Sequence, residues 1–489
     1  MLLPRLVISG LSGGAGKTML SLGLARAFAR SGLTVRALKK GPDYIDAAWL
    51  ALAARSPQGN LDPFFMPGNL LAAHFLDCAQ GYGLALVEGN RGLFDGLDLS
   101  GSCSTAELAR ILKAPVLLII DCTKMTRTAA ALVKGCRDFE PDVTIGGVIL
   151  NRTGNARHQA LVRTAVEDLA ETPVLGVLPR NTAPFIVERH MGLAGLDDQA
   201  DVPQADALLD RLADFVSAHV DLAAVRSLSL SAPPLGVKDD DAAASSSETL
   251  SPCPARPRAF SRKPRIGYAR DAAFWFYYKE NLDALERAGA ELVPLSLLDS
   301  APWPAVDGLY LGGGLPELYA QALADNTAIR AHVAALSRSG LPLYAECGGF
   351  MYLTEQIRID GNVFPMAGIF PCAVEFCSRP QGLGYVEAEV TGDNPFHPAG
   401  THFRGHEFHF SRVLPCRESG TADRAQSYVL SLRKGKGMAK GPDGLYLDGL
   451  LSGNTFASYT HIFAPAVPHW APAFVALCGG RLDGGRTAL

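Results

Sequence analysis

Apolar runs without polar alternation recur along the first half of the chain and predict strands buried on both faces of a parallel sheet. Residues 5–9 form the first run and lead into a glycine-rich loop, after which residues 18–30 carry apolar side chains at helical spacing. Further runs lie at residues 84–87, 115–120, 145–150 and 174–178. Helical stretches at 125–137 and 156–170 separate later runs, so this part of the chain is predicted to be an α/β domain.

The pattern breaks after this region and resumes at Arg265. The intervening segment has a run of aspartates, alanines and serines followed by three prolines, a composition typical of a linker. A chain of 489 residues is also too long for one ordinary core. The expected division is an N-terminal domain at 1–226, a flexible linker at 227–263 and a second α/β domain at 264–489.

Composition narrows the class of protein. Hydrophobic residues make up 48% and charged residues 19%, and the net charge of -4 comes with scattered basic residues, so no nucleic-acid footprint is present. No apolar run reaches the roughly 18 residues of a membrane helix, and the first residues do not resemble a secretory signal. Ten cysteines occur without a Cys-x-x-Cys pair, and Cys372 with Cys377 lacks a second pair that would complete a zinc site. We expect a cytoplasmic enzyme with reduced thiols, for which a homo-oligomer is compatible with the sequence.

The glycine-rich loop runs from Gly10 to Thr18 and has the form of a phosphate-binding loop. A turn of this kind points backbone N–H groups at phosphate oxygens, helped by the dipole of the following helix. Lys17 would reach the outer phosphates, and the Thr18 hydroxyl would hold Mg²⁺. The candidate ATP-binding residues are Gly13, Gly14, Gly16, Lys17 and Thr18. The alternative is a turn that binds no nucleotide, but the intact Gly-Lys-Thr between strand and helix favours ATP.

Two positions distinguish this loop from related ones. Leu11 stands where a glycine usually lies six residues before the lysine, and Ser12 stands where membrane-recruited partitioning ATPases carry a second lysine. Both favour the dethiobiotin-synthetase-like branch.

Acidic residues in the predicted N-terminal domain are candidates for metal or substrate binding. Glu88 closes the run at 84–87, at the edge where ligands bind in open parallel sheets, and is a candidate magnesium or water ligand. Asp43 and Asp46 follow Gly41-Pro42, where aspartates often only form turns. Both the functional and the turn-forming interpretation of these two aspartates fit this pattern.

A cysteine occupies a second strand-to-helix turn. The apolar run at 341–345 ends at Glu346-Cys347, and glycines follow. Such a turn exposes a nucleophile near a helix N-terminus, which favours the thiolate. Another strand ends in a glycine turn that can offer backbone donors to an oxyanion. The candidate oxyanion and glutamine-binding residues are Gly313, Gly314 and Gly348. The alternative for Cys347 is an ordinary buried cysteine.

A nucleophilic thiol needs a base, and histidines supply the candidates. His402, His406 and His409 crowd one segment, whereas His461 follows Ser458-Tyr459-Thr460. The residues alone leave this choice open.

Segments across nearly the whole chain resemble the cobyrinate a,c-diamide synthase family, in which a dethiobiotin-synthetase-like ATP domain precedes a class-I glutamine amidotransferase domain. The matching segments are 41–46, 60–62, 92–96 and 188–193 in the first domain, and 269–274, 276–278, 312–317, the Cys347 turn and 404–409 in the second.

The resemblance implies roles for individual residues. It implies a catalytic pair of Cys347 and His461. Most class-I glutaminases also carry a glutamate two residues after this histidine. The family lacks that glutamate, and in this chain the position holds Phe463. It also implies that four residues lie near the substrate carboxylate and the ATP γ-phosphate. These are Asp43, Tyr44, Asp46 and Asp95. With the loop, it makes Thr18, Asp43 and Glu88 the expected magnesium ligands.

The implied reaction is ATP-dependent activation of a tetrapyrrole carboxylate, followed by amidation with ammonia from L-glutamine, with cobyrinate as the leading acceptor. Two departures bear on that acceptor: Asp46-Ala47-Ala48-Trp49-Leu50 lacks the family's histidine, and Lys39-Lys40 replaces Lys-Val. Both are expected in the loop that meets the macrocycle, so sirohaem and nickel-sirohydrochlorin are the alternative acceptors. A partner-recruiting P-loop ATPase switch is the alternative of another class, and Ser12, Cys347 and His461 count against it.

Overall fold

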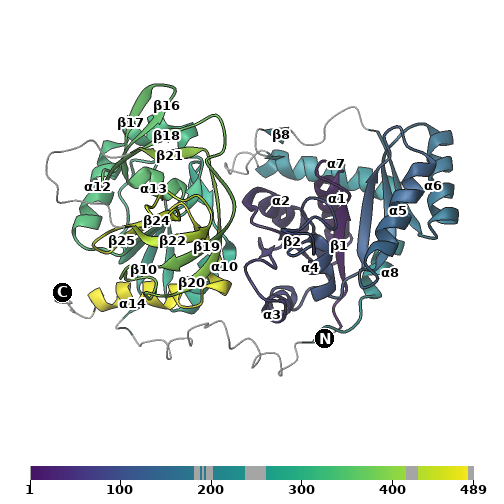
Figure 1. Ribbon diagram of the computed structural model, residues 1–489, viewed down its shortest axis with the longest axis horizontal. Coiled ribbons are helices and arrows are strands. Elements are labelled where there is room, and N and C mark those ends of the chain that lie inside the picture. The colour runs from purple at the N-terminus through teal and green to yellow at the C-terminus, as the bar shows by residue number, and fades with distance from the viewer. Residues whose placement is uncertain are drawn as a thin grey trace. The chain divides into compact units, whose positions relative to one another are not determined.

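The computed structural model describes residues 2–180, 188–189, 192–193, 202–236, 260, 262–414 and 428–482. The chain divides into two compact units, Met1–Glu248 and Thr249–Leu489, which Figure 1 shows coloured along the chain. None of the helices in the described part is both long enough and apolar enough to cross a membrane.

The first unit is built on a seven-stranded parallel sheet with the order β3-β2-β4-β1-β5-β6-β7. The strands are β1 (Arg5–Gly10), β2 (Val35–Lys40), β3 (Asn60–Leu61), β4 (Leu84–Glu88), β5 (Val116–Asp121), β6 (Ile145–Thr153) and β7 (Val174–Pro179). A pair formed by β8 (Glu188–Arg189) and β9 (Gly192–Leu193) lies apart from this sheet. Residues 190 and 191 of the segment expected at 188–193 lie outside the described residues.

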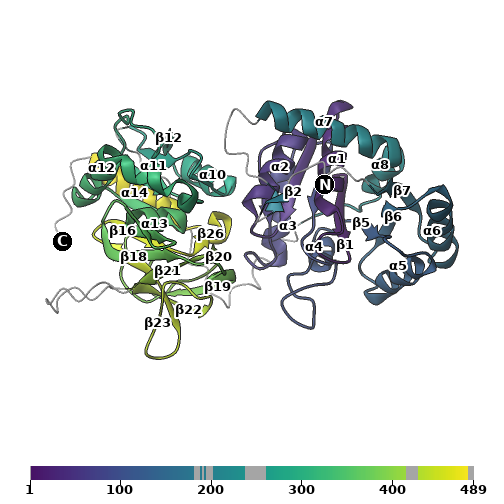
Figure 2. The same ribbon diagram turned by 90° about the horizontal axis from the view of Figure 1, so that it is seen from above.

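Helices cover both faces of this sheet, as Figure 2 shows, with α1, α2, α7 and α8 on one face and α3, α4 and α5 on the other. The helices are α1 (Lys17–Arg30), α2 (Tyr44–Ala54), α3 (Gly68–Ala79), α4 (Thr105–Ile111), α5 (Arg127–Phe139), α6 (Ala156–Leu169), α7 (Val202–His219) and α8 (Leu222–Leu230). Apolar side chains from α1, α2, α7 and α8 form one continuous core with the strands, which explains why the predicted runs are apolar throughout.

The first unit extends beyond the boundary predicted at residue 226. Helix α8 continues to Leu230, and Leu235 is buried. The fully buried guanidinium of Arg5 donates to the Pro233 carbonyl at 2.6 Å, which ties this segment to β1. The predicted start of the linker is therefore too early, because residues after 226 satisfy a buried cation. Residues 237–259, which make up most of the predicted linker, lie outside the described residues.

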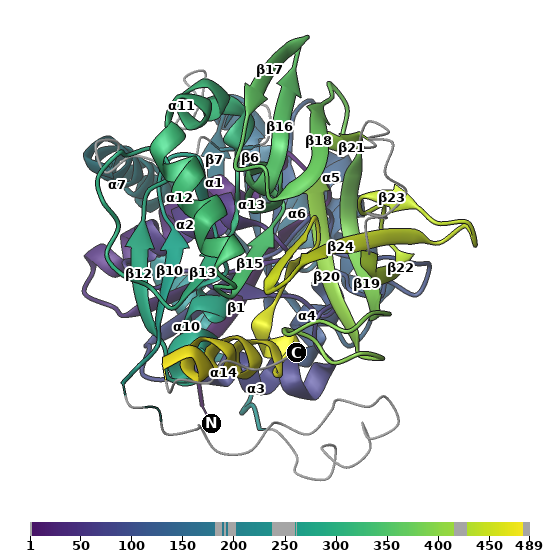
Figure 3. The same ribbon diagram turned by 90° about the vertical axis from the view of Figure 1, so that its left-hand side faces the viewer.

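The second unit contains an eleven-stranded sheet that is parallel over β12, β10, β13, β15 and β25 and antiparallel beyond. Its strands are β10 (Arg265–Ala269), β12 (Glu291–Leu295), β13 (Gly308–Leu311), β15 (Leu343–Glu346), β19 (Gly382–Val390), β20 (His402–His409), β22 (Tyr428–Lys434), β23 (Ala439–Lys440), β24 (Tyr446–Ser452), β25 (Thr455–Ser458) and β26 (His461–Ile462). The smaller sheets contain β11 (Phe274–Phe276), β14 (Gly313–Gly314), β16 (Thr354–Ile359), β17 (Asn362–Pro365), β18 (Phe370–Phe376) and β21 (Ser411–Leu414). Figure 3 turns this unit toward the viewer, with the β16–β17 hairpin at its upper edge.

Two hydrophobic cores lie on opposite faces of this sheet. One involves α11, α12 and α13, and the other involves α10 and α14. The helices are α10 (Lys279–Arg287), α11 (Ala320–Asp325), α12 (Thr327–Arg338), α13 (Gly348–Leu353) and α14 (Trp470–Leu482). The predicted α/β class with two domains is confirmed.

Candidate functional site

The phosphate-type loop connects β1 to α1, as expected. Gly14 and Gly16 have φ values of 72° and 101°, which lie in the left-handed region that favours glycine. The Lys17 ammonium donates to the Ser12 carbonyl at 2.8 Å and so folds back over the loop. A side chain on Gly16 would meet the Asn151 amide, which itself donates to Ala15 O at 2.8 Å. The predicted loop residues therefore have the conformation that the glycines indicate.

Lys39 lies at the centre of a charged cluster beside this loop. Strands β2 and β4 are parallel neighbours, so their last residues meet at one edge of the sheet. The Lys39 ammonium donates to Glu88 Oε1 at 2.8 Å and to Asp46 Oδ2 at 2.6 Å. The Thr18 hydroxyl donates to the same Glu88 oxygen at 2.7 Å. The structure thus brings the expected metal ligands Thr18 and Glu88 together with the expected substrate residue Asp46, around Lys39, which had been expected in the acceptor loop.

Charges perturb one another strongly in this cluster. Burial alone would lower the pKa of Lys39, but the carboxylates of Glu88 and Asp46 outweigh it and raise that pKa above its ordinary value. Burial, reinforced by Asp46, raises the pKa of Asp43 to about 6. Burial also raises the pKa of Glu88, and burial together with the charge on Lys39 lowers that of Lys17. The surplus of carboxyl groups favours a further cation.

One oxygen of the Glu88 carboxylate is free to bind such a cation. Its Oε2 atom is buried and has no hydrogen-bond partner among the described residues. An unsatisfied buried carboxylate oxygen is costly unless a ligand completes its coordination. Hard cations such as Mg²⁺ prefer oxygen ligands of this type, so Glu88 and the Thr18 hydroxyl fit a magnesium ion.

Asp43 and Asp95 both organise loops. Asp43 is the N-cap of α2, where its Oδ1 accepts from Asp46 N at 2.9 Å. The Asn60 amide braces this turn by donating to Gly41 O at 2.9 Å and to Asp43 O at 3.0 Å. The turn-forming interpretation of Asp43 is therefore confirmed, and its burial beside Lys39 keeps the functional one in place.

Asp95 comes from a different loop. Its Oδ2 accepts from Gly92 N at 2.9 Å, and Leu93 N donates to Gly10 O at 2.8 Å, which joins this loop to the phosphate loop. The Asp95 charge acts on Lys17. Tyr44 is buried in the first turn of α2. The predicted substrate and phosphoryl residues thus surround the same edge of the sheet.

The segment from Asp46 to Leu50 does not form the loop that the sequence analysis expected. It lies inside α2, and Trp49 and Leu50 are buried in the core of the first unit. Its alanines and leucines favour a helix once Asp43 caps it. Lys39 and Lys40 lie on β2 instead of a loop, and successive strand residues point to opposite faces. Lys40 accordingly interacts with Asp62.

Cys347 joins β15 to α13 in a strained backbone conformation, with φ 48° and ψ -101°. Its N–H donates to Ser458 O at 2.7 Å, and its thiol donates to Phe408 O at 3.7 Å. A sharp turn of this type presents the nucleophile at the end of a parallel strand. The predicted turn is therefore present.

Burial of Cys347 opposes the predicted preference for a thiolate in the free protein. Burial raises the pKa of the Cys347 thiol above its ordinary value, and the charges of Glu317 and Glu346 add to the effect. The following helix has only six residues, so its dipole does not offset the loss of solvation. The thiol must lose its proton during attack, which requires a base.

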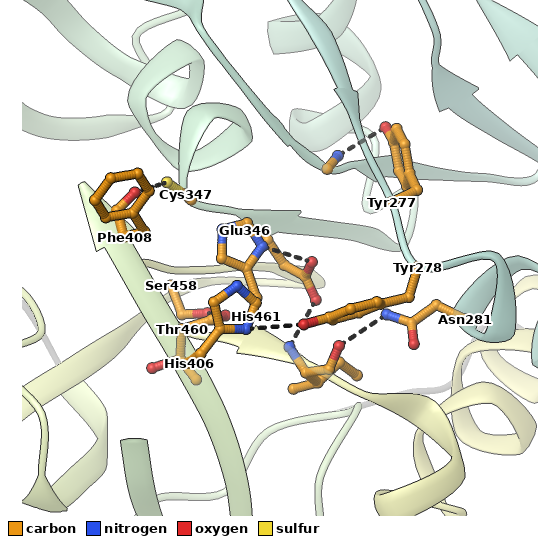
Figure 4. Close-up of polar contacts among 12 residues, drawn as sticks. Tyr277, Tyr278, Asn281, Glu346, Cys347, His406, Phe408, Ser458, Thr460 and His461 are labelled. Carbon is orange, nitrogen blue, oxygen red and sulfur yellow. Dashed lines mark hydrogen bonds and ion pairs between the residues drawn. The ribbon is translucent and has the colours of Figure 1, made fainter. Parts of the chain in front are cut away.

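The predicted glycines pack closely against His461 and against one another. A side chain on Gly313 would lie 2.6 Å from His461 Cε1, and one on Gly348 would lie 3.0 Å from Gly314 N. These close approaches explain why the turn is built from glycine. Figure 4 shows His461 with one edge toward Glu346 and the ring between that carboxylate and Cys347.

Two of the candidate histidines lie together. The rings of His406 and His461 stack with centroids 4.7 Å apart and planes 16° apart. His409 instead stacks on Tyr459, and His402 is exposed on β20. The geometry therefore places His461, and His406 beside it, near the cysteine turn.

Comparisons with known proteins agree with this arrangement. Residues 6–193 match the CobQ/CobB/MinD/ParA nucleotide binding domain, and residues 265–467 match the CobB/CobQ-like glutamine amidotransferase domain. A cobyrinate a,c-diamide synthase of Magnetococcus marinus is 40% identical over 96% of both chains. Those of Syntrophotalea carbinolica and Methanothermobacter thermautotrophicus are 40% and 36% identical over 98% and 96% of this chain, and over 99% and 98% of their own. The chain belongs to the cobyrinate a,c-diamide synthase family. Like its relatives, it is a glutamine-dependent amidoligase.

Several polar residues around the cysteine of this family member make contacts that their sequence motifs did not predict. Tyr277 OH accepts from Gly312 N at 2.8 Å, and Tyr278 OH contacts His406 Nδ1 at 3.2 Å. Glu346 Oε2 lies 3.3 Å from His461 Nδ1. The one available signal was a glutamate inside an apolar strand, because a buried carboxylate requires partners.

Proposed function

We propose that the protein converts cobyrinate to cobyrinate a,c-diamide, with L-glutamine as nitrogen donor and ATP as activating co-substrate. The observation that carries this proposal is the similarity at 40% identity over 96% of the chain to a cobyrinate a,c-diamide synthase. The two sites described above support it, because one suits a nucleotide and the other suits attack on a carboxamide.

The first unit would activate the carboxylate. A side-chain carboxylate of the macrocycle attacks the γ-phosphorus of ATP, which gives an acyl phosphate and releases ADP. Lys17 and the loop N–H groups would hold the phosphates, while Asp43, Tyr44, Asp46 and Asp95 surround the reacting groups. A magnesium ion held by Thr18, Glu88 and Asp43 would neutralise phosphate charge there.

The second unit would supply ammonia. The Cys347 thiol attacks the glutamine amide carbon while His461 takes its proton and passes it to the departing nitrogen. Water then hydrolyses the glutamyl thioester to glutamate. N–H groups of Gly313, Gly314 and Gly348 are the proposed donors to the oxyanion. Ammonia displaces phosphate from the acyl phosphate, and two rounds give the diamide.

The test offers cobyrinate, sirohaem and nickel-sirohydrochlorin separately to the purified protein with ATP, Mg²⁺ and glutamine. Each amidation lowers the acceptor mass by about one unit, so the proposal expects two such steps on cobyrinate. A mass change only on one of the other two would move the assignment to that acceptor. No change on any of them, even with free ammonia, would reject the proposed substrate class.

The burial of Trp49 and Leu50 supports a packing role for one of the two departures that raised the alternative acceptors. Trp49 and Leu50 pack in the core of the first unit, so their identity affects packing. The ATPase-switch alternative predicts no release of glutamate from glutamine, and the same assay would detect it.

A further inference from the structure

The histidine of the glutaminase site lacks the carboxylate expected two residues after it. Phe463 occupies that position, is fully buried and packs edge-to-face on Tyr278 with ring centroids 5.1 Å apart. This apolar setting leaves no favourable place for a charge. A catalytic imidazole nevertheless needs an acceptor that fixes its tautomer and orientation.

We propose that Glu346 supplies this function and is the positioning residue for His461, an inference that rests on the proposed glutaminase reaction. Glu346 Oε2 lies 3.3 Å from His461 Nδ1, and Oε1 accepts from Ile462 N at 3.3 Å. One carboxylate therefore contacts both the ring and the adjacent backbone. Glu346 precedes Cys347 directly, so the same strand end carries nucleophile and carboxylate.

Neighbouring groups hold this carboxylate in place. Tyr310 OH donates to Glu346 Oε2 at 3.1 Å. The Asn281 amide donates to Tyr310 OH at 3.2 Å and to Ile462 O at 3.0 Å, and its oxygen accepts from Ala464 N at 2.7 Å. Figure 4 shows Asn281 and Glu346 joined by dashed lines to the backbone of the residue after His461. A buried network with satisfied members fixes geometry before the ligand binds.

The arrangement assigns each nitrogen of His461 a task. Nδ1–H donates to Glu346, which leaves Nε2 with its lone pair. Nε2 takes the Cys347 proton as the S–C bond forms and returns it to the departing ammonia as the C–N bond breaks. Glu346 accepts the Nδ1–H hydrogen bond throughout and stabilises the transient imidazolium.

Other titratable groups lie close to this site, and Glu317, whose charge acts on Cys347, has its pKa raised by burial to about 7. Burial, and secondarily the charge of His461, lowers the pKa of the stacked His406 well below its ordinary value. Burial raises the pKa of Tyr310 and of Cys347. Because Glu317 is unchanged in every variant below, a shift of the acid limb between the wild type and a Glu346 variant isolates the effect of Glu346.

The test compares Glu346→Gln with the wild-type enzyme. We expect kcat for glutamine hydrolysis to fall about 10²-fold while KM changes less than about threefold. The acid limb should move to lower pH by about one unit, because loss of the negative charge makes protonation of the ring less favourable. Amidation with free ammonia should be unchanged.

A matched control is Asp448→Asn. Asp448 is equally buried and accepts from Tyr459 N and Thr460 N, both at 3.0 Å, just before His461. Its loss should lower stability and kcat without moving the acid limb. An equal movement in this variant would show a general charge effect and overturn the proposal, as would an unchanged kcat and pH profile in Glu346→Gln.

A second variant covers a folding failure, and two measurements of glutamate release test the glutaminase reaction separately. If Glu346→Gln does not fold, Glu346→Asp replaces it, because the shorter side chain withdraws the carboxylate from Nδ1 and keeps the charge; an unchanged kcat and acid limb there would overturn the proposal. Wild-type enzyme that releases no glutamate, or Cys347→Ala that still releases it, would instead reject the glutaminase reaction itself.

Discussion

The two candidate sites differ in how their buried carboxylates are stabilised. In the first unit, Lys39 lies between Glu88 and Asp46, and the cluster contains more carboxyl groups than the protein's own cations neutralise well. In the second, Glu346 accepts hydrogen bonds from Tyr310 and the Ile462 backbone and contacts His461, without an adjacent lysine or arginine in the described network.

This difference matches the ligands that each site would receive. Phosphates and a metal ion bring charge, so a site for them has to tolerate a new balance when they arrive. The amide of glutamine is neutral, so its site can be assembled in advance from hydrogen bonds. The comparison predicts that substitutions in the two units will fail in different ways.

The largest expected effect separates the units by nitrogen donor. Cys347→Ala should lower glutamine-dependent amidation by at least about 10³-fold but keep amidation with ammonia, because only the thiol is lost. Lys17→Ala should lower both by a similar factor, because carboxylate activation fails. Product mass with each donor measures the two rates.

The assignment of separate tasks to the two units is wrong if a folded Cys347→Ala variant also loses amidation with ammonia. It also fails if Lys17→Ala keeps its ammonia-dependent rate. Circular dichroism and the unfolding temperature of each variant serve as controls for folding.

The next effect concerns the charge balance of the first unit. Lys39→Met should lower the free energy of unfolding by about 3–5 kcal/mol, because it leaves the buried Glu88 carboxylate and the partly buried Asp46 carboxylate without their cation. Mg²⁺ should restore more stability to this variant than to the wild type, since a ligand that binds the folded state stabilises it. Urea unfolding with and without Mg²⁺ measures both changes.

Lys40→Met is the matched control, because Lys40 is the next residue on the same strand and is also buried. Burial lowers the pKa of Lys40, so this lysine is less strongly held as a cation. Lys40→Met should lower the free energy of unfolding by less than Lys39→Met does. Mg²⁺ should stabilise the Lys40→Met variant no more than it stabilises the wild type. Equal losses in the two variants would contradict the special role of Lys39.

The sequence predicted those parts of both sites that are continuous along the chain. The loop around Lys17 and the turn at Cys347 are local patterns, so glycine spacing and flanking apolar runs suffice to find them. Glu88 was found because it ends a buried strand.

The sequence did not predict contacts that depend on strand register. Lys39 contacts Glu88 only because β2 and β4 are neighbours in the sheet. The sequence of neither strand shows which strand it pairs with. Glu346 reaches His461 across β15 and β26, which are far apart in sequence. The Gly-Pro-Asp motif also suggested a loop continuing past Asp46, where helix propensity and the Asp43 cap prevail.

The third expected effect is on the pH dependence of the second unit. His397 Nδ1 lies 3.0 Å from His469 Nε2, and Tyr344 OH lies 3.2 Å from His397 Nε2. Burial lowers the pKa of His397 well below its ordinary value and that of His469 to about 4. Stability from these groups is complete above the ordinary histidine pKa and is lost as pH falls toward 4, because the unfolded chain binds more protons.

Each such histidine should contribute a slope of up to about 1.4 kcal/mol per pH unit in this window. Unfolding free energies measured between pH 7 and 4.5 test the slope. His397→Gln should have a shallower slope, whereas replacement of the exposed His402 by Gln should leave it as in the wild type. Equal slopes in all three proteins would mean that this histidine pair does not control acid sensitivity.

The smallest expected effect tests whether the glutaminase site is assembled in advance. Tyr277 OH accepts from Gly312 N at 2.8 Å and donates to Tyr310 O at 3.3 Å, so Tyr277→Phe leaves a buried N–H without its acceptor next to the glycine turn. Stability should fall by about 1–2 kcal/mol. If the turn provides oxyanion donors, kcat for glutamine hydrolysis should fall by up to about tenfold.

Tyr268→Phe removes the same atom from a neighbouring ring, whose centroid lies 5.6 Å from that of Tyr277, and should change stability by less than about 0.5 kcal/mol. Amidation with ammonia should be normal in both variants, because neither change touches the first unit. A loss of kcat in Tyr277→Phe alone would mean that the hydroxyl orients the donors before glutamine arrives. An unchanged kcat would mean that the glycine turn takes its active geometry only around the ligand, and the contrast between a prearranged amide site and a phosphate site that adjusts to its ligands would then no longer hold.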